Sequence, residues 1–139
     1  MDEYVLKFFP KRMPNEVADR FYTYDWKQVE STHSKHVIGT AINRDGELIA
    51  AFELRLWKLE QEGAYDFKIC KLEVVPELQH EGYGVGVLSS LYMKYHPNTI
   101  DAEYVDPAED GGASKEWLLS LGYKEIPDSP CNILYKDFK

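Results

Sequence analysis

Residues 71–95 read KLEVVPELQHEGYGVGVLSSLYMKY, and this stretch decides how the rest of the chain is interpreted. Its pattern predicts a strand that ends at Val75, a break at Pro76, a short loop with glycines and then a helix. A strand that leads through a glycine-bearing turn into a helix N-terminus offers backbone amides and a partial positive charge to an anion. The stretch therefore predicts a phosphate-binding loop.

Length and composition narrow the kinds of protein that this chain can be. The 139 residues predict a single domain over 1–139, and 44% hydrophobic with 29% charged residues is ordinary for a soluble globule. No apolar run approaches membrane-spanning length and no leader-like segment opens the chain, so we expect a cytoplasmic protein with no membrane partner. A formal net charge of -8 argues against nucleic-acid binding and favours a cationic partner.

Cysteine and histidine spacings give no sign of a metal site. Cys70 and Cys131 lie far apart in the sequence, which predicts two reduced thiols. His33, His36 and His96 form no ligand spacing with cysteines or acids. We therefore predict no metal cofactor.

The segments before the loop predict strands and one helix. Residues 4–9 are rich in strand formers, and residues 14–31 predict a helix that begins at Pro14-Asn15-Glu16. Strand patterns over 37–42 and 47–57 flank Asn43-Arg44-Asp45-Gly46, in which Asp-Gly is a strong hairpin signal. A further strand is predicted over 66–75.

The segments after the loop complete the pattern. Apolar residues at helical spacing predict a helix that ends before Pro97, followed by a strand over 99–105 and a turn over 106–112. A helix over 113–121 and a strand over 132–138 follow. The order β-α-β-β-β-α-β-α-β predicts an α/β domain with a mixed, largely antiparallel central sheet flanked by helices.

The loop carries a recognisable motif. Residues 79–84, QHEGYG, fit the pattern Q/R-x-x-G-x-G/A, and glycines allow backbone amides to approach a phosphate closely. Here the sequence resembles the GNAT superfamily of N-acetyltransferases. The run VVPELQHEGYGVGVL over 74–88 is similar to the family's V-x-P-E-x-Q/R-x-x-G-x-G-x-x-L, with Val87 where leucine is usual. Leu121-Gly122-Tyr123 resembles the family's leucine-glycine-aromatic element, and the order of elements also agrees.

Two other interpretations of the loop stay open. A dinucleotide site would use Gly82-x-Gly84 at the helix start, with Asp101 or Glu103 as the ribose ligand. The third glycine of that fingerprint falls at Val87, however, and the loop follows an antiparallel hairpin. A tight strand-to-helix turn without a ligand is the second alternative.

The resemblance implies a binding site for acetyl-CoA. The end of the strand before the loop would pair with the pantetheine arm, the loop amides would hold the pyrophosphate, and the N–H of Val74 would stabilise an oxyanion at the thioester carbonyl. The cofactor-binding residues predicted in this way are Leu72, Val74, Val75, Gln79, His80, Glu81, Gly82, Tyr83, Gly84 and Val85.

Acid and base groups are harder to assign. Candidate general bases are Glu53, Asp66 and Glu73, and Glu73 is predicted as the catalytic residue because it lies closest along the chain to the cofactor segment. Strand alternation turns Glu73 away from the face of Leu72 and Val74, and a relayed water is an alternative base.

The chain also departs from the family at two positions. The tyrosine that many members use as thiolate proton donor, five residues before the aromatic of the leucine-glycine-aromatic element, is replaced here by Leu118. Glu81 places an acid where the family often has lysine or arginine, so the cofactor's 3′-phosphate needs another cation. Lys94 and Lys115 are the candidates.

The sequence thus predicts a GNAT-type N-acetyltransferase. It would transfer an acetyl group from acetyl-CoA to a primary amine of a small molecule or protein, by direct attack in a ternary complex. The alternative is a non-catalytic acyl-CoA-binding or interaction module of the same fold. Monomer and homodimer both stay open.

Overall fold

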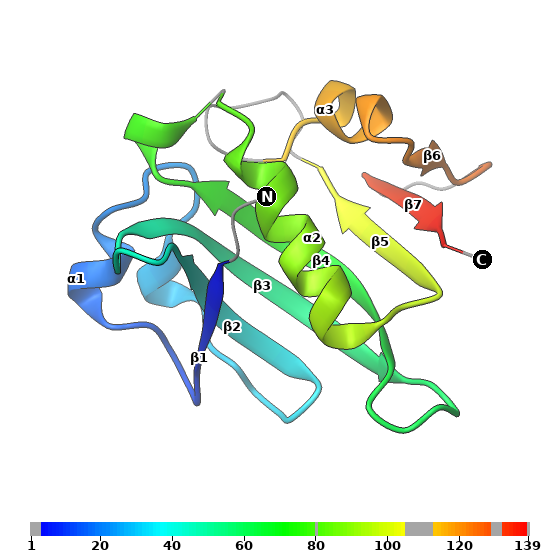
Figure 1. The fold of residues 1–139 in the computed structure, drawn as a ribbon, viewed down its shortest axis with the longest axis horizontal. Coiled ribbons are helices and arrows are strands. Elements are labelled where there is room, and N and C mark those ends of the chain that lie inside the picture. Colours follow the sequence, from blue (N-terminus) through cyan, green and yellow to red (C-terminus); the bar gives the residue numbers. More distant parts are fainter. Residues whose placement is uncertain (1–3, 80, 105–112, 129–131, 139) are drawn as a thin grey trace.

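Seven strands form one sheet in the order β1-β2-β3-β4-β5-β7-β6 in a computed structural model of the chain (Figure 1). The structure describes residues 4–79, 81–104, 113–128 and 132–138. The strands are β1 (Val5–Phe9), β2 (His36–Ile42), β3 (Leu48–Lys58), β4 (Tyr65–Val74), β5 (Thr99–Glu103), β6 (Lys124–Glu125) and β7 (Ile133–Asp137). The helices are α1 (Asn15–Ala18), α2 (Tyr83–Tyr95) and α3 (Lys115–Ser120), with 3-10 turns η1 (Trp26–Gln28) and η2 (Pro76–Leu78).

The sheet is antiparallel except where β4 meets β5. These two strands pair in parallel, in the register from Phe67 opposite Ile100 to Ile69 opposite Ala102. Strand β4 then continues to Val74, beyond the last pair with β5 in the described part of the chain. The predicted mixed, largely antiparallel sheet is therefore confirmed, and it opens between β4 and β5 on the side that leads into the loop.

Two hydrophobic cores lie on the two faces of the sheet. Helix α2 crosses the front of the sheet in Figure 1 and packs with α3 into a core that includes Phe52 and Leu118. The segment from α1 to η1 packs on the other face, where Trp26 and Val75 are buried. Among the described residues no helix is long and apolar enough to cross a membrane.

The predicted helix over residues 14–31 is wrong. Only α1 and the short turn η1 form there, although Phe21, Trp26 and Val29 are buried as the apolar pattern indicated. The backbone amides of residues 22–24 donate to the side chain of Glu73 on β4 instead of to helix carbonyls. A partner distant in the sequence has overridden the local helical spacing.

The remaining elements agree with prediction except in detail. The hairpin of β2 and β3 forms at residues 43–46, with Gly46 at φ 82°. The short strand β6 was not predicted. The predicted turn over 106–112 lies outside the described residues.

Gly39 in β2 gives a direct test of the packing between the first three strands. It lies between Phe8 and Phe52, whose rings meet edge-to-face at 5.7 Å, and a Cβ there would lie 2.5 Å from the Lys7 carbonyl oxygen. We expect Gly39→Ala to lower the free energy of unfolding by about 3 kcal/mol, measured by urea denaturation.

Gly63→Ala is the matched control. Gly63 has a positive φ of 80°, and a methyl group added to its Cα would meet open space, so only backbone strain opposes alanine. We expect a loss of about 1 kcal/mol for it. An equal loss in the two variants would contradict the packing argument at Gly39.

Candidate functional site

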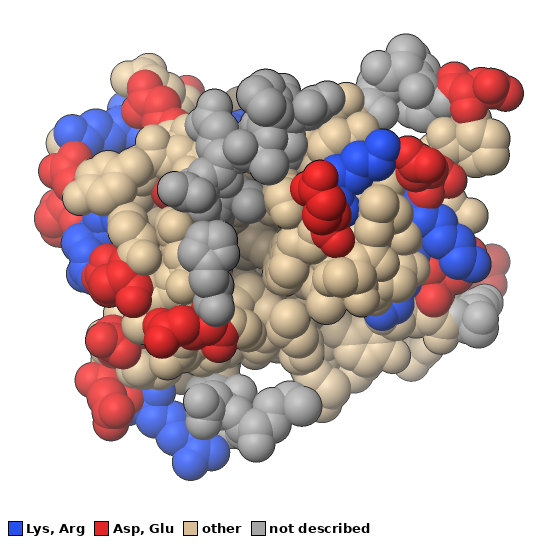
Figure 2. Space-filling model, turned by 90° about the horizontal axis from the view of Figure 1, so that it is seen from above, with Lys and Arg blue, Asp and Glu red and all other residues tan. Residues whose placement is uncertain are grey.

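A pocket opens where β4 ends and α2 begins. Its volume is about 160 Å³, and it is bounded by the end of β4, the loop and the start of α3. The lining residues are Leu72, Val74, Leu78, Gln79, Gly82, Tyr83, Gly84, Ala113, Ser114 and Trp117. Figure 2 views this end of the molecule and shows a hollow in the uncharged surface, with both acidic and basic side chains to its sides.

Local backbone geometry builds the loop. Pro76 opens η2 and ends β4, and Gly82 adopts a left-handed conformation (φ 86°) as the N-cap residue of α2. Glycine provides no side-chain oxygen to cap the helix, so first-turn amides are available to an external acceptor. Gln79 fixes the loop from the other side, because its Nε2 donates to the Val74 carbonyl at 3.0 Å.

The two motif glycines serve different purposes. A Cβ on Gly82 would meet nothing within 4 Å, so this position borders open space. A Cβ on Gly84 would lie 2.9 Å from Cζ2 of Trp117. Gly84 therefore allows the α3 indole to pack against the start of α2, which closes one side of the pocket.

Most predicted cofactor residues meet at this pocket, and three do not. Glu81 and Val85 line a separate depression of about 360 Å³ beside Tyr4, which Gly82 and Tyr83 also border. Val75 is fully buried in the second core, and its amide donates to the Ile49 carbonyl. His80 lies outside the described residues.

Sequence reasoning missed the contribution of α3. Ser114 caps this helix by accepting a hydrogen bond from the Trp117 amide at 3.2 Å, and both residues line the pocket. A serine directly before an apolar helical pattern is an N-cap signal, so the helix start was detectable. The position of Trp117 against the loop could not be detected from the sequence, because only the tertiary packing brings α3 to α2.

The two lysines that are candidates for binding the cofactor's 3′-phosphate lie at different places. Lys94 is in the last turn of α2, with its Nζ 5.1 Å from the centre of the Phe8 ring, so it is at the wrong end of the helix for the loop. Lys115 follows the lining residue Ser114, and its Nζ lies 2.6 Å from a carboxylate oxygen of Glu125. Lys115 is therefore near the pocket but engaged in an ion pair.

Glu73 on β4 is fully buried, with a relative exposure of 0%. Its Oε2 accepts from the amides of Tyr22 (2.8 Å) and Thr23 (2.9 Å), and its Oε1 accepts from the Tyr24 amide (3.2 Å) and the Trp26 indole (2.9 Å). An ionised carboxylate has about four lone-pair positions, so these donors use all of them. The geometry favours an anchoring role for Glu73, and its predicted role as general base stays a prediction.

The other two candidate bases lie in different surroundings. Asp66 accepts from the amides of Asn98 (2.8 Å) and Thr99 (2.9 Å) at the start of β4, which is the end of the strand remote from the loop. Glu53 instead lies on β3 opposite Lys71, close to where β4 and β5 separate. Of the two, only Glu53 is near the sheet opening.

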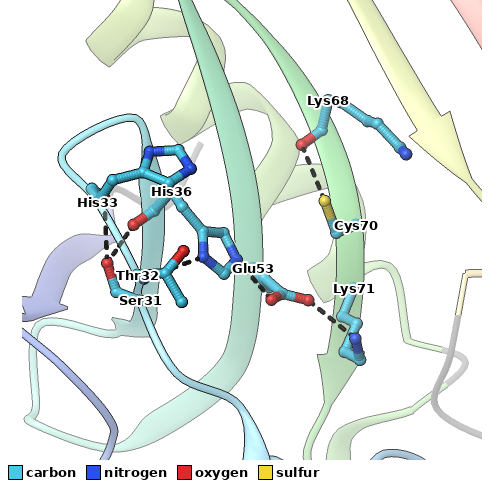
Figure 3. Close-up of polar contacts among 8 residues, drawn as sticks. All are labelled: Ser31, Thr32, His33, His36, Glu53, Lys68, Cys70 and Lys71. Carbon is cyan, nitrogen blue, oxygen red and sulfur yellow. Dashed lines mark hydrogen bonds and ion pairs between the residues drawn. The ribbon is translucent and has the colours of Figure 1, made fainter.

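Buried Glu53 contacts two basic side chains, buried His36 and half-buried Lys71 (Figure 3). Its Oε2 lies 2.6 Å from Nε2 of His36 and its Oε1 lies 2.9 Å from Nζ of Lys71. The Thr32 amide donates to Nδ1 of His36 at 3.4 Å, which leaves Nε2 as the proton-bearing nitrogen that faces Glu53. Burial raises the pKa of Glu53, but the hydrogen bonds from Lys71 and His36 outweigh it and lower that pKa below its usual value.

The remaining expected site features concern metals and thiols. In the described ranges no group of three or more His, Cys, Asp and Glu is arranged to hold a metal ion. Cys70 is a free thiol in the β4 bulge opposite Glu53 and Leu54, and burial raises its pKa. Cys131 lies outside the described residues.

Comparison with known proteins finds matches in structure but not in sequence. No protein-family model and no curated protein sequence matches the chain. The Bacillus subtilis N-acetyltransferase YlbP, solved with coenzyme A, matches with a TM-score of 0.60 at 13% identity, over 96% of each chain. AtaTR bound with AcCoA matches with a TM-score of 0.54 at 13% identity, over 99% of this chain and 94% of that one.

The chain has the GNAT N-acetyltransferase fold. A third GNAT-type match, the KacTA–DNA complex, has a TM-score of 0.59 at 14% identity and covers 97% of this chain and 93% of that one. The GNAT fold replaces the dinucleotide alternative, because the described strands form one parallel pair instead of a parallel doubly wound order. Within this GNAT fold Leu118 is fully buried in the first core.

The Glu53 cluster predicts a specific dependence of stability on pH. Because the folded-state pKa of Glu53 lies below its ordinary value of 4.5, its contribution is present above that pH and is lost as the pH falls through the folded-state value. We expect the wild-type protein to lose more unfolding free energy between about pH 6 and about pH 3 than Glu53→Gln, measured by urea denaturation at each pH.

The matched control for this comparison is Glu62→Gln, at an exposed position in the turn between β3 and β4. It should follow the wild-type pH dependence. A Glu53→Gln curve parallel to that of the wild-type protein would mean that Glu53 adds no acid-sensitive stability.

Proposed function

We propose that this protein is an N-acetyltransferase that transfers an acetyl group from acetyl-CoA to a primary amine. The observation that carries the proposal is the pocket at the N-terminus of α2, lined by β4 residues Leu72 and Val74 and by loop residues Gln79, Gly82 and Gly84. An anion at this position meets the amides and the positive end of the helix. The apolar wall of the pocket, formed by β4 and Trp117, suits the pantetheine arm of acetyl-CoA.

The proposed reaction needs orientation more than covalent chemistry. The amine nitrogen attacks the thioester carbonyl, the Val74 amide stabilises the developing oxyanion, and the coenzyme A thiolate leaves. The ammonium proton must first be removed by a base and the thiolate must gain a proton. A direct attack in a ternary complex requires no acetylated enzyme.

The acceptor is proposed only as a chemical class. A net charge of -8 favours a cationic amine, either a small molecule or a protein side chain or N-terminus. We propose that such an amine approaches the thioester where β4 extends beyond its last pair with β5 in the described part of the chain. A cytoplasmic location and the monomeric or dimeric state stay predictions.

A non-catalytic acyl-CoA-binding module is the second candidate. The observation that favours it is Leu118, a buried leucine at the position where the family often has the proton-donating tyrosine. Such a module would keep the cofactor pocket and lack transfer. Binding and turnover therefore separate the two candidates.

Gly82→Asp tests the cofactor pocket. The substitution places a carboxylate at the helix N-terminus, where it would repel the pyrophosphate, and we expect the dissociation constant for coenzyme A to rise about 100-fold or more. Isothermal titration calorimetry measures it. Gly63→Asp, the same substitution at another glycine of positive φ (80°) remote from the pocket, should bind like the wild-type protein. Unchanged affinity in Gly82→Asp would refute this placement of the site.

Turnover tests the enzyme against the binding module. We expect acetyl-CoA to release free thiol in the presence of at least one amine among spermidine, an aminoglycoside, a peptide with a free N-terminus and Nα-acetyl-lysine. A thiol-reactive dye measures the release, and coenzyme A binding is measured in parallel. Tight binding without release from any of these amines would favour the non-catalytic module.

A further inference from the structure

We propose that Glu73 is a positioning residue for the amine acceptor and not the base. In this proposal its carboxylate fixes residues 22–26 as one wall of the acceptor site, on the sheet face opposite the cofactor pocket. The inference rests on the proposed acetyl transfer and adds to it the residue that orders the acceptor side. It starts from the alternation of side chains along β4.

Strand β4 presents different residues to its two faces. Leu72 and Val74 line the cofactor pocket, while Glu73 between them turns to the other face and is buried there against residues 22–26. Lys71 lies on the same face as Glu73, opposite Glu53. Glu73 is therefore directly behind the part of β4 that borders the pocket.

The backbone amides of residues 22–24 take their acceptor from the Glu73 side chain. These residues form neither helix nor strand, and three consecutive amides converge on one carboxylate. The Trp26 indole adds a fourth donor and is itself buried. Buried donors without an acceptor are costly, so the conformation of this segment follows from the position of Glu73.

The same segment is tied to the cofactor loop at its start. Arg20 Nη2 lies 2.6 Å from Oε1 of Glu77, which belongs to η2 between β4 and the loop. This exposed ion pair contributes little by itself. Together with Glu73 it joins the segment to both the strand and the turn that shape the pocket.

One aromatic side chain of the segment, that of Tyr24, lies beside Lys71 on β4. The Lys71 ammonium lies 5.8 Å from the centre of the Tyr24 ring and 2.9 Å from Glu53, at the level where β4 has passed its last pair with β5. Tyr22, two residues before Tyr24, is 79% exposed. An amine that reaches the thioester through the opening passes this surface, so its orientation depends on the segment.

The arrangement also explains why Glu73 is unsuited to proton transfer. Every lone-pair position of the carboxylate faces a protein donor, and the side chain has no exposed surface. A general base must come within hydrogen-bond distance of the proton it removes, directly or through one water. Glu53, whose carboxylate contacts Lys71 and His36, is a charged group on this face that could come within hydrogen-bond distance of that proton.

Steady-state kinetics of Glu73→Gln tests the proposal, with the best amine of the four probes above. The amide replaces one acceptor oxygen with a donor, so part of the segment loses its anchor. We expect the acceptor KM to rise about tenfold while the dissociation constant of coenzyme A and the acid limb of the pH–rate profile stay as in the wild-type protein. Glu62→Gln is the matched control and should leave all three unchanged.

Trp26→Phe tests the same wall without touching the carboxylate. It removes one of the four donors, and a positioning role predicts a smaller rise of the acceptor KM in the same direction. A wild-type acceptor KM in both variants would overturn the proposal. So would loss of the acid limb in Glu73→Gln with a fall in kcat at constant KM, which is the signature of a base. If Glu73→Gln does not fold, Trp26→Phe decides alone.

The proposed function fails in a distinguishable way. Absence of coenzyme A binding or of amine-dependent thiol release in the wild-type protein would overturn the acetyl transfer itself, and the positioning role with it. Wild-type binding and turnover with an unaltered acceptor KM in the variants would overturn only the role of Glu73.

Discussion

The buried carboxylate of Glu73 is the interaction that anchors residues 22–26 to β4, directly behind the candidate pocket. An ionised group can be buried only when its hydrogen-bonding capacity is satisfied, and here three backbone amides and one indole satisfy it. This requirement holds Glu73 on the second face of β4. Alternation along the strand then places Leu72 and Val74 on the face that borders the pocket. Glu73 thus anchors a loop on one face of β4, while its neighbours Leu72 and Val74 line the pocket on the other.

On the face that borders the pocket, packing and backbone conformation cooperate. Gly82 accepts a positive φ and borders open space, whereas Gly84 is needed because Trp117 fills the space that a side chain would take. The loop is therefore held in place: Gln79 bonds it to β4, and α3 packs against it. A preorganised loop of this kind binds an anion without a large ordering cost.

Sequence reasoning succeeded where the controlling interactions are local. The hairpin at residues 43–46, the break at Pro76 and the helix that follows depend on turn chemistry and periodicity within a few residues, and they form as predicted. The helix over 14–31 failed because its buried residues contact the sheet and its amides find Glu73, some 50 positions away. For residues 14–31 the spacing of apolar residues predicted correctly which side chains are buried, but it predicted the wrong secondary structure.

The sequence by itself determined the fold class and the loop of the candidate site, because glycine, proline and alternating apolar residues constrain the backbone wherever they occur. It also named Glu73 as a residue of interest. Only the tertiary structure decided what surrounds that carboxylate, that Trp117 closes the pocket, and that Lys94 is at the far end of α2. These features depend on contacts between segments distant in the chain, for which a single sequence carries no periodic signal.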